Sequence, residues 1–316
     1  MYLNQVLKYR NEFWRYILGF FTVFLGSQII GSVPLILALF IKKYLGGDVN
    51  FSDETMIYRA FDPNIMLLLM LIPFLVGFVA LRFWMKPIHD QPFKTLHSSK
   101  EKLNWNKVWF SFMLCALLVV ASVIIGYYLS PDEYIINFKL VPFLIMLLIA
   151  GILIPIQSSF EEYLFRGYLM QGIAAYTKNR WMPLLVTSVV FGCMHLLNPE
   201  VEKLGYIVMV SYIGTGLFLG IITLMDDGLE LAIGFHVANN LFTALLVTAD
   251  WTAFQTHSVL KYIGEPSVSW DIFIPVLIVF PILIFIFSKK YKWSGWKEKL
   301  FGKLDESVVT NEIEQN

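Results

Sequence analysis

Long apolar runs separated by short polar segments make up almost the whole chain. Eight of these runs approach the roughly 20 mostly apolar residues that a membrane-spanning helix needs. They cover residues 16–41, 65–84, 108–129, 140–158, 181–197, 206–225, 229–248 and 272–288. The pattern therefore predicts about eight transmembrane helices in one all-α, polytopic membrane bundle.

Composition supports the same class of protein. Of the 316 residues, 57% are hydrophobic and 15% are charged, and the mean hydropathy is +0.63. Soluble domains are rarely so apolar, so we expect a multi-pass membrane protein that contacts lipid. Residues 1–288 are expected to form a single transmembrane domain, and residues 289–316 a cytoplasmic tail that is basic and aromatic at first and then acidic and polar. A net charge of zero gives no reason to expect nucleic acid as a partner.

Lysine and arginine residues indicate the orientation, because cytoplasmic loops of membrane proteins carry an excess of them. With the N-terminus inside, eighteen of the 24 fall on the cytoplasmic side, counting Arg82 at the inner end of the second run, and six fall outside. Both termini are therefore predicted to be cytoplasmic. In a bacterium this membrane would be the plasma membrane.

Ionisable and amide side chains interrupt three of the apolar runs or follow them directly. Placing a charged residue at the centre of a membrane helix costs about 3 kcal/mol even on the mildest scale, so such residues usually have a function. Residues four apart share a helix face, which is the spacing of Glu162 from Arg166 and of His236 from Asn240. Three polar faces, contributed by Glu161, Glu162 and Arg166, by His195, and by His236 and Asn240, can therefore converge in one cavity.

These residue types suit peptide hydrolysis. A glutamate or histidine can take a proton from water, and histidine or asparagine can donate hydrogen bonds to the oxyanion that forms on the carbonyl. We expect Glu161 and His195 to activate the water, and His236 and Asn240 to stabilise the oxyanion. Glu162 and Arg166 are expected to form an intrahelical pair that neutralises two buried charges without touching the substrate.

The order of these motifs resembles the CPBP intramembrane proteases, a family that includes the type II CaaX prenyl endopeptidases and the Abi or bacteriocin-immunity proteins. The family pattern of two glutamates, three residues and an arginine reads here as Glu161 to Arg166. Phenylalanine and histidine four apart read as Phe191 and His195, and histidine and asparagine four apart as His236 and Asn240. The resemblance covers roughly residues 140–250, and it implies the same division of catalytic roles.

The resemblance implies an intramembrane endopeptidase that cuts hydrophobic or membrane-anchored peptides and proteins. It leaves an alternative open, a non-catalytic immunity or peptide-binding protein on the same fold. The family was classed as metalloproteases, and a metal-free glutamate mechanism is also argued for it. In the metal-dependent alternative, Glu161, His195 and His236 would be the ligands of a divalent metal such as zinc, since one carboxylate and two imidazoles form a common catalytic shell.

Three further expectations concern the structure around this site. A fourth helix that ends at residue 158 would leave Glu161 far from His195, so we expect the helix to continue through residues 163–176. Gly216 and Gly220 have the four-residue spacing that lets membrane helices approach closely. The loop 86–107 is basic and contains Pro87 and Pro92, and it is expected to be a solvated segment with no role for His89.

Overall fold

The fold is an all-α bundle, as predicted. The computed structural model describes residues 2–51, 54–100, 102–268 and 270–305. Its longer helices are α1 (Phe13–Tyr44), α3 (Pro63–His89), α4 (Trp105–Leu129), α5 (Leu140–Glu162), α7 (Trp181–Cys193), α9 (Met209–Asp226), α10 (Glu230–Leu246) and α11 (Phe280–Tyr291). The shorter ones are η1 (Tyr2–Lys8), α2 (Glu54–Tyr58), η2 (Phe93–Leu96), η3 (Pro131–Glu133), η4 (Tyr163–Leu169), α6 (Met170–Thr177), α8 (Pro199–Leu204), η5 (Tyr206–Val208), η6 (Trp270–Phe273), η7 (Pro275–Val279) and α12 (Trp296–Phe301).

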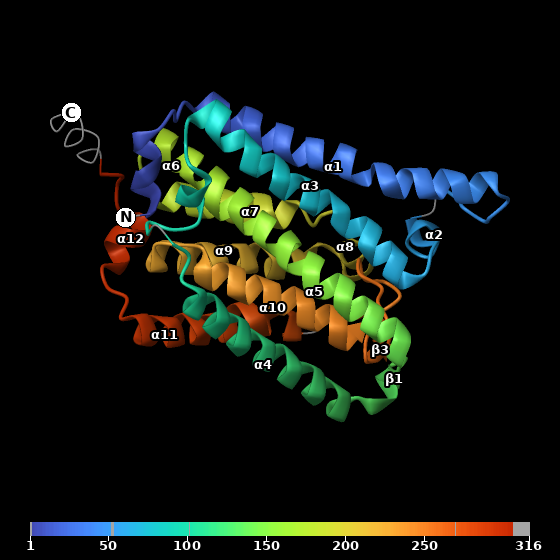
Figure 1. Cartoon of the computed structure of the whole chain (residues 1–316). Helices are drawn as coiled ribbons and strands as arrows, with labels where there is room; N and C mark the ends of the chain where they lie inside the picture. The colour runs from blue at the N-terminus through green and yellow to red at the C-terminus, as the bar shows by residue number, and fades with distance from the viewer. Residues whose placement is uncertain (1, 52–53, 101, 269, 306–316) are drawn as a thin grey trace.

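The helices run roughly along a common direction (Figure 1). Helices α1 and α3 form one side of the bundle, α4 and α11 form the other, and α5, α7, α9 and α10 lie between them. Both ends of the described chain lie at one end of the bundle, where the Tyr2 backbone N–H donates to Asp227 over 2.9 Å. The described chain therefore begins and ends at the same end of the bundle, and the cytoplasmic location of both termini stays a prediction.

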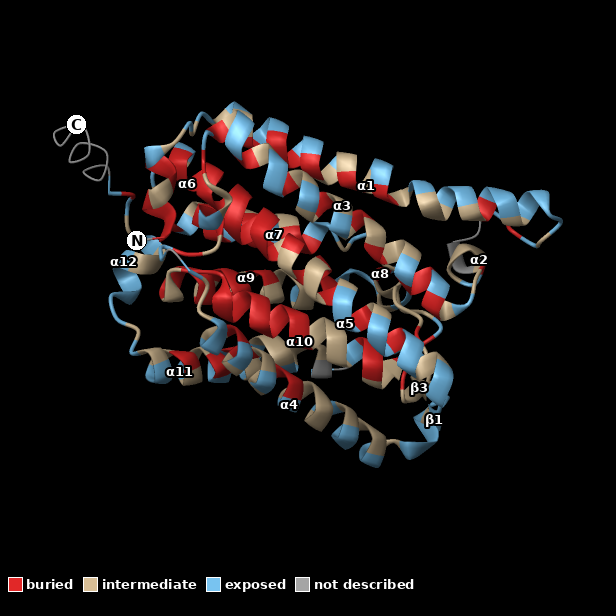
Figure 2. Ribbon diagram, viewed as in Figure 1, coloured by how far each residue is buried: buried red, intermediate tan, exposed pale blue. Residues whose placement is uncertain are grey.

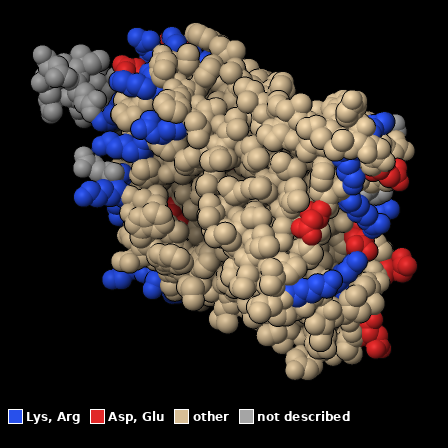
Figure 3. All heavy atoms as spheres, turned by 45° about the vertical axis from the view of Figure 1, so that its right-hand side comes forward, with Lys and Arg blue, Asp and Glu red and all other residues tan. Residues whose placement is uncertain are grey.

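The outer surface is that of a membrane protein. Five of the described helices are long and apolar enough to cross a bilayer, namely those spanning Phe13–Tyr44, Pro63–His89, Trp105–Leu129, Leu140–Thr177 and Tyr206–Asp226. Large apolar side chains cover their outer faces, as at Ile29 and Ile30 of α1, which are 68% and 64% exposed. Figure 3 shows charged atoms gathered toward two ends of the molecule, with a broad uncharged belt between them. The chain is therefore a multi-pass membrane protein.

The helix that carries the two glutamates is longer than the apolar run that predicts it. Helix α5 passes directly into the π-helical segment η4 and then into α6, so one helix runs from Leu140 to Thr177. The expected continuation through residues 163–176 is therefore confirmed. Glu161 and Glu162 lie past the middle of this helix, well inside the bundle rather than at its edge.

Other boundaries differ from the sequence prediction by a few residues. The fifth run was expected to be helical to residue 197, but α7 ends at Cys193 and a turn follows. Three short strands, β1 (Tyr134–Ile136), β2 (Val247–Thr248) and β3 (Leu260–Tyr262), form a sheet at the end of the bundle away from the termini. Strand β3 lies in the middle, antiparallel to β1 and parallel to β2.

The loop 86–107 is not the solvated segment that its charge suggests. The side chains of His89, Gln91 and Leu96 are fully buried. Gln91 donates to Gln171 of α6 over 2.9 Å, and a ring nitrogen of His89 lies 2.8 Å from the hydroxyl of Tyr168. The prediction was wrong because polar uncharged residues of this segment satisfy buried groups on the long helix, while Lys86, Lys94, Lys100 and Lys102 stay exposed. Lys107 is itself largely covered and pairs with Asp226 over 2.6 Å. The far end of the tail, 306–316, lies outside the described residues.

Buried side chains concentrate where the long helix meets α7 and α10 (Figure 2). Glycines permit this packing. A Cβ atom at Gly216 of α9 would lie 2.8 Å from the backbone oxygen of Ser188 in α7, and one at Gly220 would lie 2.5 Å from Leu184. The predicted close approach at these two glycines is confirmed.

We expect Gly216→Ala to destabilise the protein by about 1–3 kcal/mol, because the new methyl group meets backbone atoms that cannot rotate away. Gly151→Ala is the matched control, since a Cβ there has no neighbour within 4 Å and alanine favours a helix over glycine by about 1 kcal/mol. Thermal unfolding of the purified protein in detergent measures both changes. Equal melting temperatures for the two variants would contradict the packing argument.

Candidate active site

The three predicted polar faces meet where the end of α5, the end of α7 and the middle of α10 come together. Glu161 and Glu162 are the last-but-one and last residues of α5, and Arg166 lies in the π-helical segment η4 that follows. His236 and Asn240 lie on one face of α10. His195 lies in the turn just beyond α7. The arrangement brings the catalytic candidates to one region of the bundle.

Glu162 lies at the centre of this region. Its Oε1 atom accepts hydrogen bonds from Arg166 Nη1 over 2.9 Å and from His236 Nδ1 over 2.7 Å. The side chains of Glu162 and Arg166 are both 0% exposed. The predicted structural pair is therefore present, and it also positions the histidine on α10.

Arg166 is held from two further directions. Its Nη2 atom donates to the backbone oxygen of Gly216 over 3.1 Å, so the close approach of α9 supplies an acceptor. Its guanidinium carbon lies 4.3 Å from the centroid of the Phe191 ring, within the range of a cation–π interaction. Phe191 thus has a function that spacing alone does not reveal, because it covers a buried positive charge.

Glu161 lies beside the other ring nitrogen of His236. The distance from His236 Nε2 to Glu161 Oε2 is 3.4 Å, and Gln157 Nε2 donates to Glu161 Oε1 over 2.7 Å. The Oε2 atom is buried and has no hydrogen-bond partner among the described residues. One oxygen of Glu161 is therefore fixed, and the other is free to bind a water molecule or a substrate.

Asn240 is tied to the same helix as the glutamates. Its amide nitrogen donates to Gln157 Oε1 over 3.1 Å and to Ser158 Oγ over 3.3 Å, and the neighbouring Asn239 donates to its Oδ1. Sequence reasoning missed Gln157 and Ser158, since they lie at the end of an apolar run. The four-residue spacing of Gln157 from Glu161 is the pattern that would have found the first of them.

His195 stands apart from this hydrogen-bonded cluster. Within the described part of the chain it forms no hydrogen bond or ion pair with Glu161; its Nδ1 atom lies 2.9 Å from the Phe191 carbonyl oxygen, and its ring stacks on Tyr212 with centroids 4.3 Å apart. Because Nδ1 must donate to the carbonyl, Nε2 of the neutral ring carries a lone pair. His195 can therefore accept a proton, as expected of a base.

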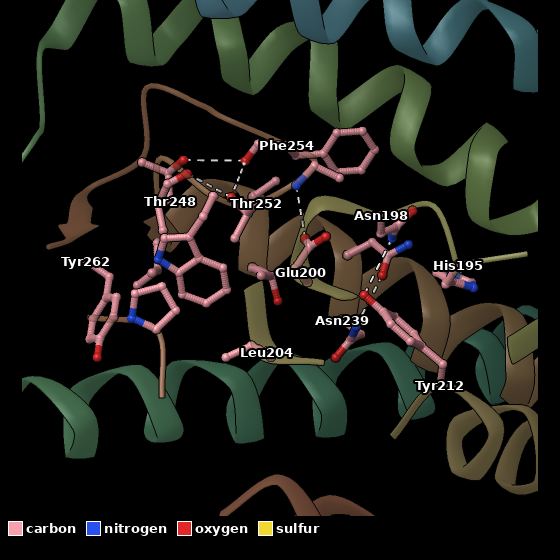
Figure 4. A pocket seen from close by; sticks show the side chains of 18 of the residues that line it. His195, Asn198, Glu200, Leu204, Tyr212, Asn239, Thr248, Thr252, Phe254 and Tyr262 are labelled. Carbon is pink, nitrogen blue, oxygen red and sulfur yellow. Dashed lines mark hydrogen bonds between the residues drawn. The ribbon is translucent and has the colours of Figure 1, made fainter. Parts of the chain in front are cut away.

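Glu161, His195 and Asn240 line one cavity of about 940 Å³. The cavity extends from these residues to the short sheet, where Glu133 and Tyr262 form part of its wall. Figure 4 shows His195 and Asn239 near one end of this space and Thr248 and Tyr262 near the other, with Glu200 between them. A peptide in an extended conformation can lie along such a cavity and reach the polar cluster.

The arrangement does not provide the predicted zinc site. Glu161 and His236 are adjacent, but no group of three or more His, Cys, Asp and Glu side chains in the described residues is placed to hold a metal ion. His195 would have to move toward the other two to complete the shell. Zinc stays a prediction, and we derive no step through a metal.

Comparison with known proteins supports the resemblance found in the motifs. Residues 138–242 match the family model of the type II CAAX prenyl endopeptidase Rce1-like proteins. This confirms the predicted family resemblance. The chain is also 29% identical over 286 residues to the uncharacterized protein YyaK of Bacillus subtilis strain 168, a match that covers 89% of this chain and 94% of that protein. No solved structure matches.

The matched segment contains all of the predicted site residues. It begins just before α5 and ends within α10, so it includes the two glutamates, Arg166, both motif histidines and Asn240. The family match therefore falls on the part of the chain that carries the predicted site. Helices α1 and α3 on one side of the bundle, and α4 and α11 on the other, lie outside the match.

We expect Arg166→Met to lower the free energy of unfolding by about 3–5 kcal/mol, because it leaves the buried Glu162 carboxylate without its cation. Lys86→Met is the matched control, since Lys86 pairs with Asp90 on the surface, where both side chains are more than half exposed and such a pair contributes about 1 kcal/mol or less. Thermal unfolding in detergent compares the two. Adding Glu162→Gln to Arg166→Met should recover part of the lost stability. Equal destabilisation by Arg166→Met and Lys86→Met would contradict a buried, stabilising role of the Glu162–Arg166 pair.

Proposed function

We propose that this protein is an intramembrane endopeptidase that hydrolyses peptide bonds of membrane-associated substrates. The observation that carries the proposal is the carboxylate of Glu161, which has one oxygen fixed by Gln157 and the other unpaired beside His236, on the wall of a cavity large enough for a peptide. The family match supports a hydrolase of this kind.

Charge balance determines how the cluster carries protons. Arg166 is positive, and Glu161 and Glu162 together carry two negative charges when ionised, so one additional proton makes the four groups neutral. Net charge is costly inside a membrane bundle. Glu162 fixes Nδ1 of His236, and His236 Nε2 and Glu161 Oε2, 3.4 Å apart, are the two atoms between which a proton can move. A carboxylate and an imidazole that share one proton can act as base and acid in turn.

In the reaction, Glu161 takes a proton from a water molecule that attacks the carbonyl carbon. Once the substrate displaces their present partners, Glu161 for His236 Nε2 and Gln157 for Asn240, these two side chains donate hydrogen bonds to the oxyanion. Glu161 then returns its proton to the leaving amine. His195 contacts the water or the substrate from the α7 side of the cavity with its free Nε2 atom. These roles keep Glu161 as the base and His236 and Asn240 as the oxyanion donors, and they give His195 a contact role in place of the water activation expected from the sequence. Glu162 and Arg166 position His236.

We expect Glu161→Gln to reduce the cleavage rate of a membrane-anchored fluorogenic peptide by at least about 100-fold, since an amide cannot take the proton from water. The variant keeps an oxygen that can accept the Gln157 hydrogen bond, so folding should be preserved. Glu202→Gln, an exposed carboxylate of α8, is the control and should cleave at the wild-type rate. Cleavage by Glu161→Gln at the wild-type rate would refute the base assignment.

The same assay separates the alternatives that the sequence left open. Activity that survives a chelator in metal-free buffer argues against zinc, and activity that is lost and then restored by zinc supports it. A wild-type protein that binds the peptides without cleaving them, together with equal binding by Glu161→Ala, would favour the non-catalytic immunity role.

A further inference from the structure

Carboxylates line the cavity without a lysine or arginine, and His195 is the one histidine in its lining among the described residues. Three carboxylates line it, from Glu133, Glu161 and Glu200, and no lysine or arginine does so among the described residues. Two basic residues on the sheet side, Arg59 and Lys261, pair with Asp250, and none of these three residues lines the cavity. The charge balance of the catalytic cluster accounts for Glu161 but leaves Glu200 unexplained.

Glu200 lies on α8, outside the membrane-spanning helices, and its carboxylate is held in place. Its Oε1 atom accepts the backbone N–H of Ala253 over 2.9 Å, which ties α8 to the loop that follows β2. Its Oε2 atom is buried and has no hydrogen-bond partner in the described residues. A buried carboxylate oxygen without a partner is costly, so this atom is suited to a hydrogen-bond donor that arrives with the substrate.

The surroundings of Glu200 favour a cation as that donor. The Tyr212 and Phe254 side chains lie on either side of Glu200 in the cavity (Figure 4), and Trp251 also lines the cavity. Aromatic faces attract lysine and arginine side chains. Burial raises the pKa of the Glu200 carboxyl above its ordinary value, although the Ala253 hydrogen bond and the nearby His195 lower it. A cation placed beside the carboxyl lowers the pKa further, so ionisation of Glu200 and binding of a cation reinforce each other.

We propose that the cavity selects peptides that carry a positively charged group among apolar residues, and that Glu200 binds this group. The inference rests on the proposed function, since it names the substrate class of the same cavity. A peptide whose only nearby charge is a carboxylate would meet three glutamates and no cation. A lysine or arginine side chain and a free N-terminal ammonium offer the same chemistry, and the experiment must distinguish them.

The test compares three membrane-anchored peptides of one sequence. The first contains a lysine and an acetylated N-terminus, the second has norleucine in place of that lysine, and the third has norleucine and a free N-terminus. The lysine is moved along the peptide one position at a time, and kcat/KM is measured for each. We expect the wild type to prefer a cationic peptide over the neutral one by about tenfold or more at one position, because buried charge pairs at interfaces are worth that much.

Glu200→Gln should reduce this preference to within about twofold. Glutamine keeps an oxygen for the Ala253 N–H, so a purely structural role of Glu200 would leave the preference unchanged. Glu202→Gln removes the same charge from the exposed face of the same helix and should keep the preference. Each preference is a ratio within one protein sample, so partial loss of folded protein does not affect it. A wild type without preference, or a preference that survives Glu200→Gln, would overturn the proposal.

Failure of the proposed function can be recognised separately. If no peptide is cleaved, fluorescence anisotropy measures binding of the same labelled peptides to the purified protein. Tighter binding of a cationic peptide that is lost in Glu200→Gln and kept in Glu202→Gln supports the cation site without proteolysis. Equal binding of cationic and neutral peptides overturns it.

Discussion

The ion pair of Glu162 with Arg166 constrains most of the structure around it. Both side chains are fully buried, and such charges are tolerated only when they are paired and most of their hydrogen-bonding groups have partners. Glu162 Oε2 and Arg166 Nε are the two atoms of the pair that lack one among the described residues. The acceptor for Arg166 on α9 requires the glycine that lets this helix approach, and the covering ring comes from α7. The histidine that completes the arrangement comes from α10. Three helices are thus positioned by one charge pair on a fourth.

This arrangement separates stability from chemistry on adjacent residues. Glu162 has one oxygen shared by an arginine and a histidine and does not line the cavity. Glu161, the residue before it, lines the cavity with an oxygen that has no partner. Successive residues on a helix point about 100° apart, so two neighbouring glutamates can face the protein core and the cavity. Their adjacency in sequence follows directly from that geometry.

Much of the fold and part of the site could be predicted from the sequence. The apolar runs predict the helices because a helix that crosses lipid must be long and mostly apolar. The four-residue spacing predicts the Glu162–Arg166 pair because residues one helical turn apart are neighbours whatever the rest of the fold. The contacts between helices are not local. Nothing in the sequence distinguishes Glu200 from Glu202, which are both in a short polar connection, yet one lines the cavity and the other is exposed. The burial of Gln91 likewise depends on Gln171, eighty residues away.

The π-helical segment η4 changes the rotational phase of the long helix. A π-helical turn contains more residues than an α-helical turn, so side chains after Leu169 are rotated relative to where an uninterrupted α-helix would place them. One continuous rod can then direct Glu161 toward the cavity and, beyond the segment, direct Gln171 toward the buried loop at the other end of the bundle. A helical wheel drawn through both halves assigns one of them to the wrong face. Deleting a single residue within this segment would restore the regular α-helical rotation of the side chains. The residues on one side of the segment would then turn away from the helices and the loop that they now contact.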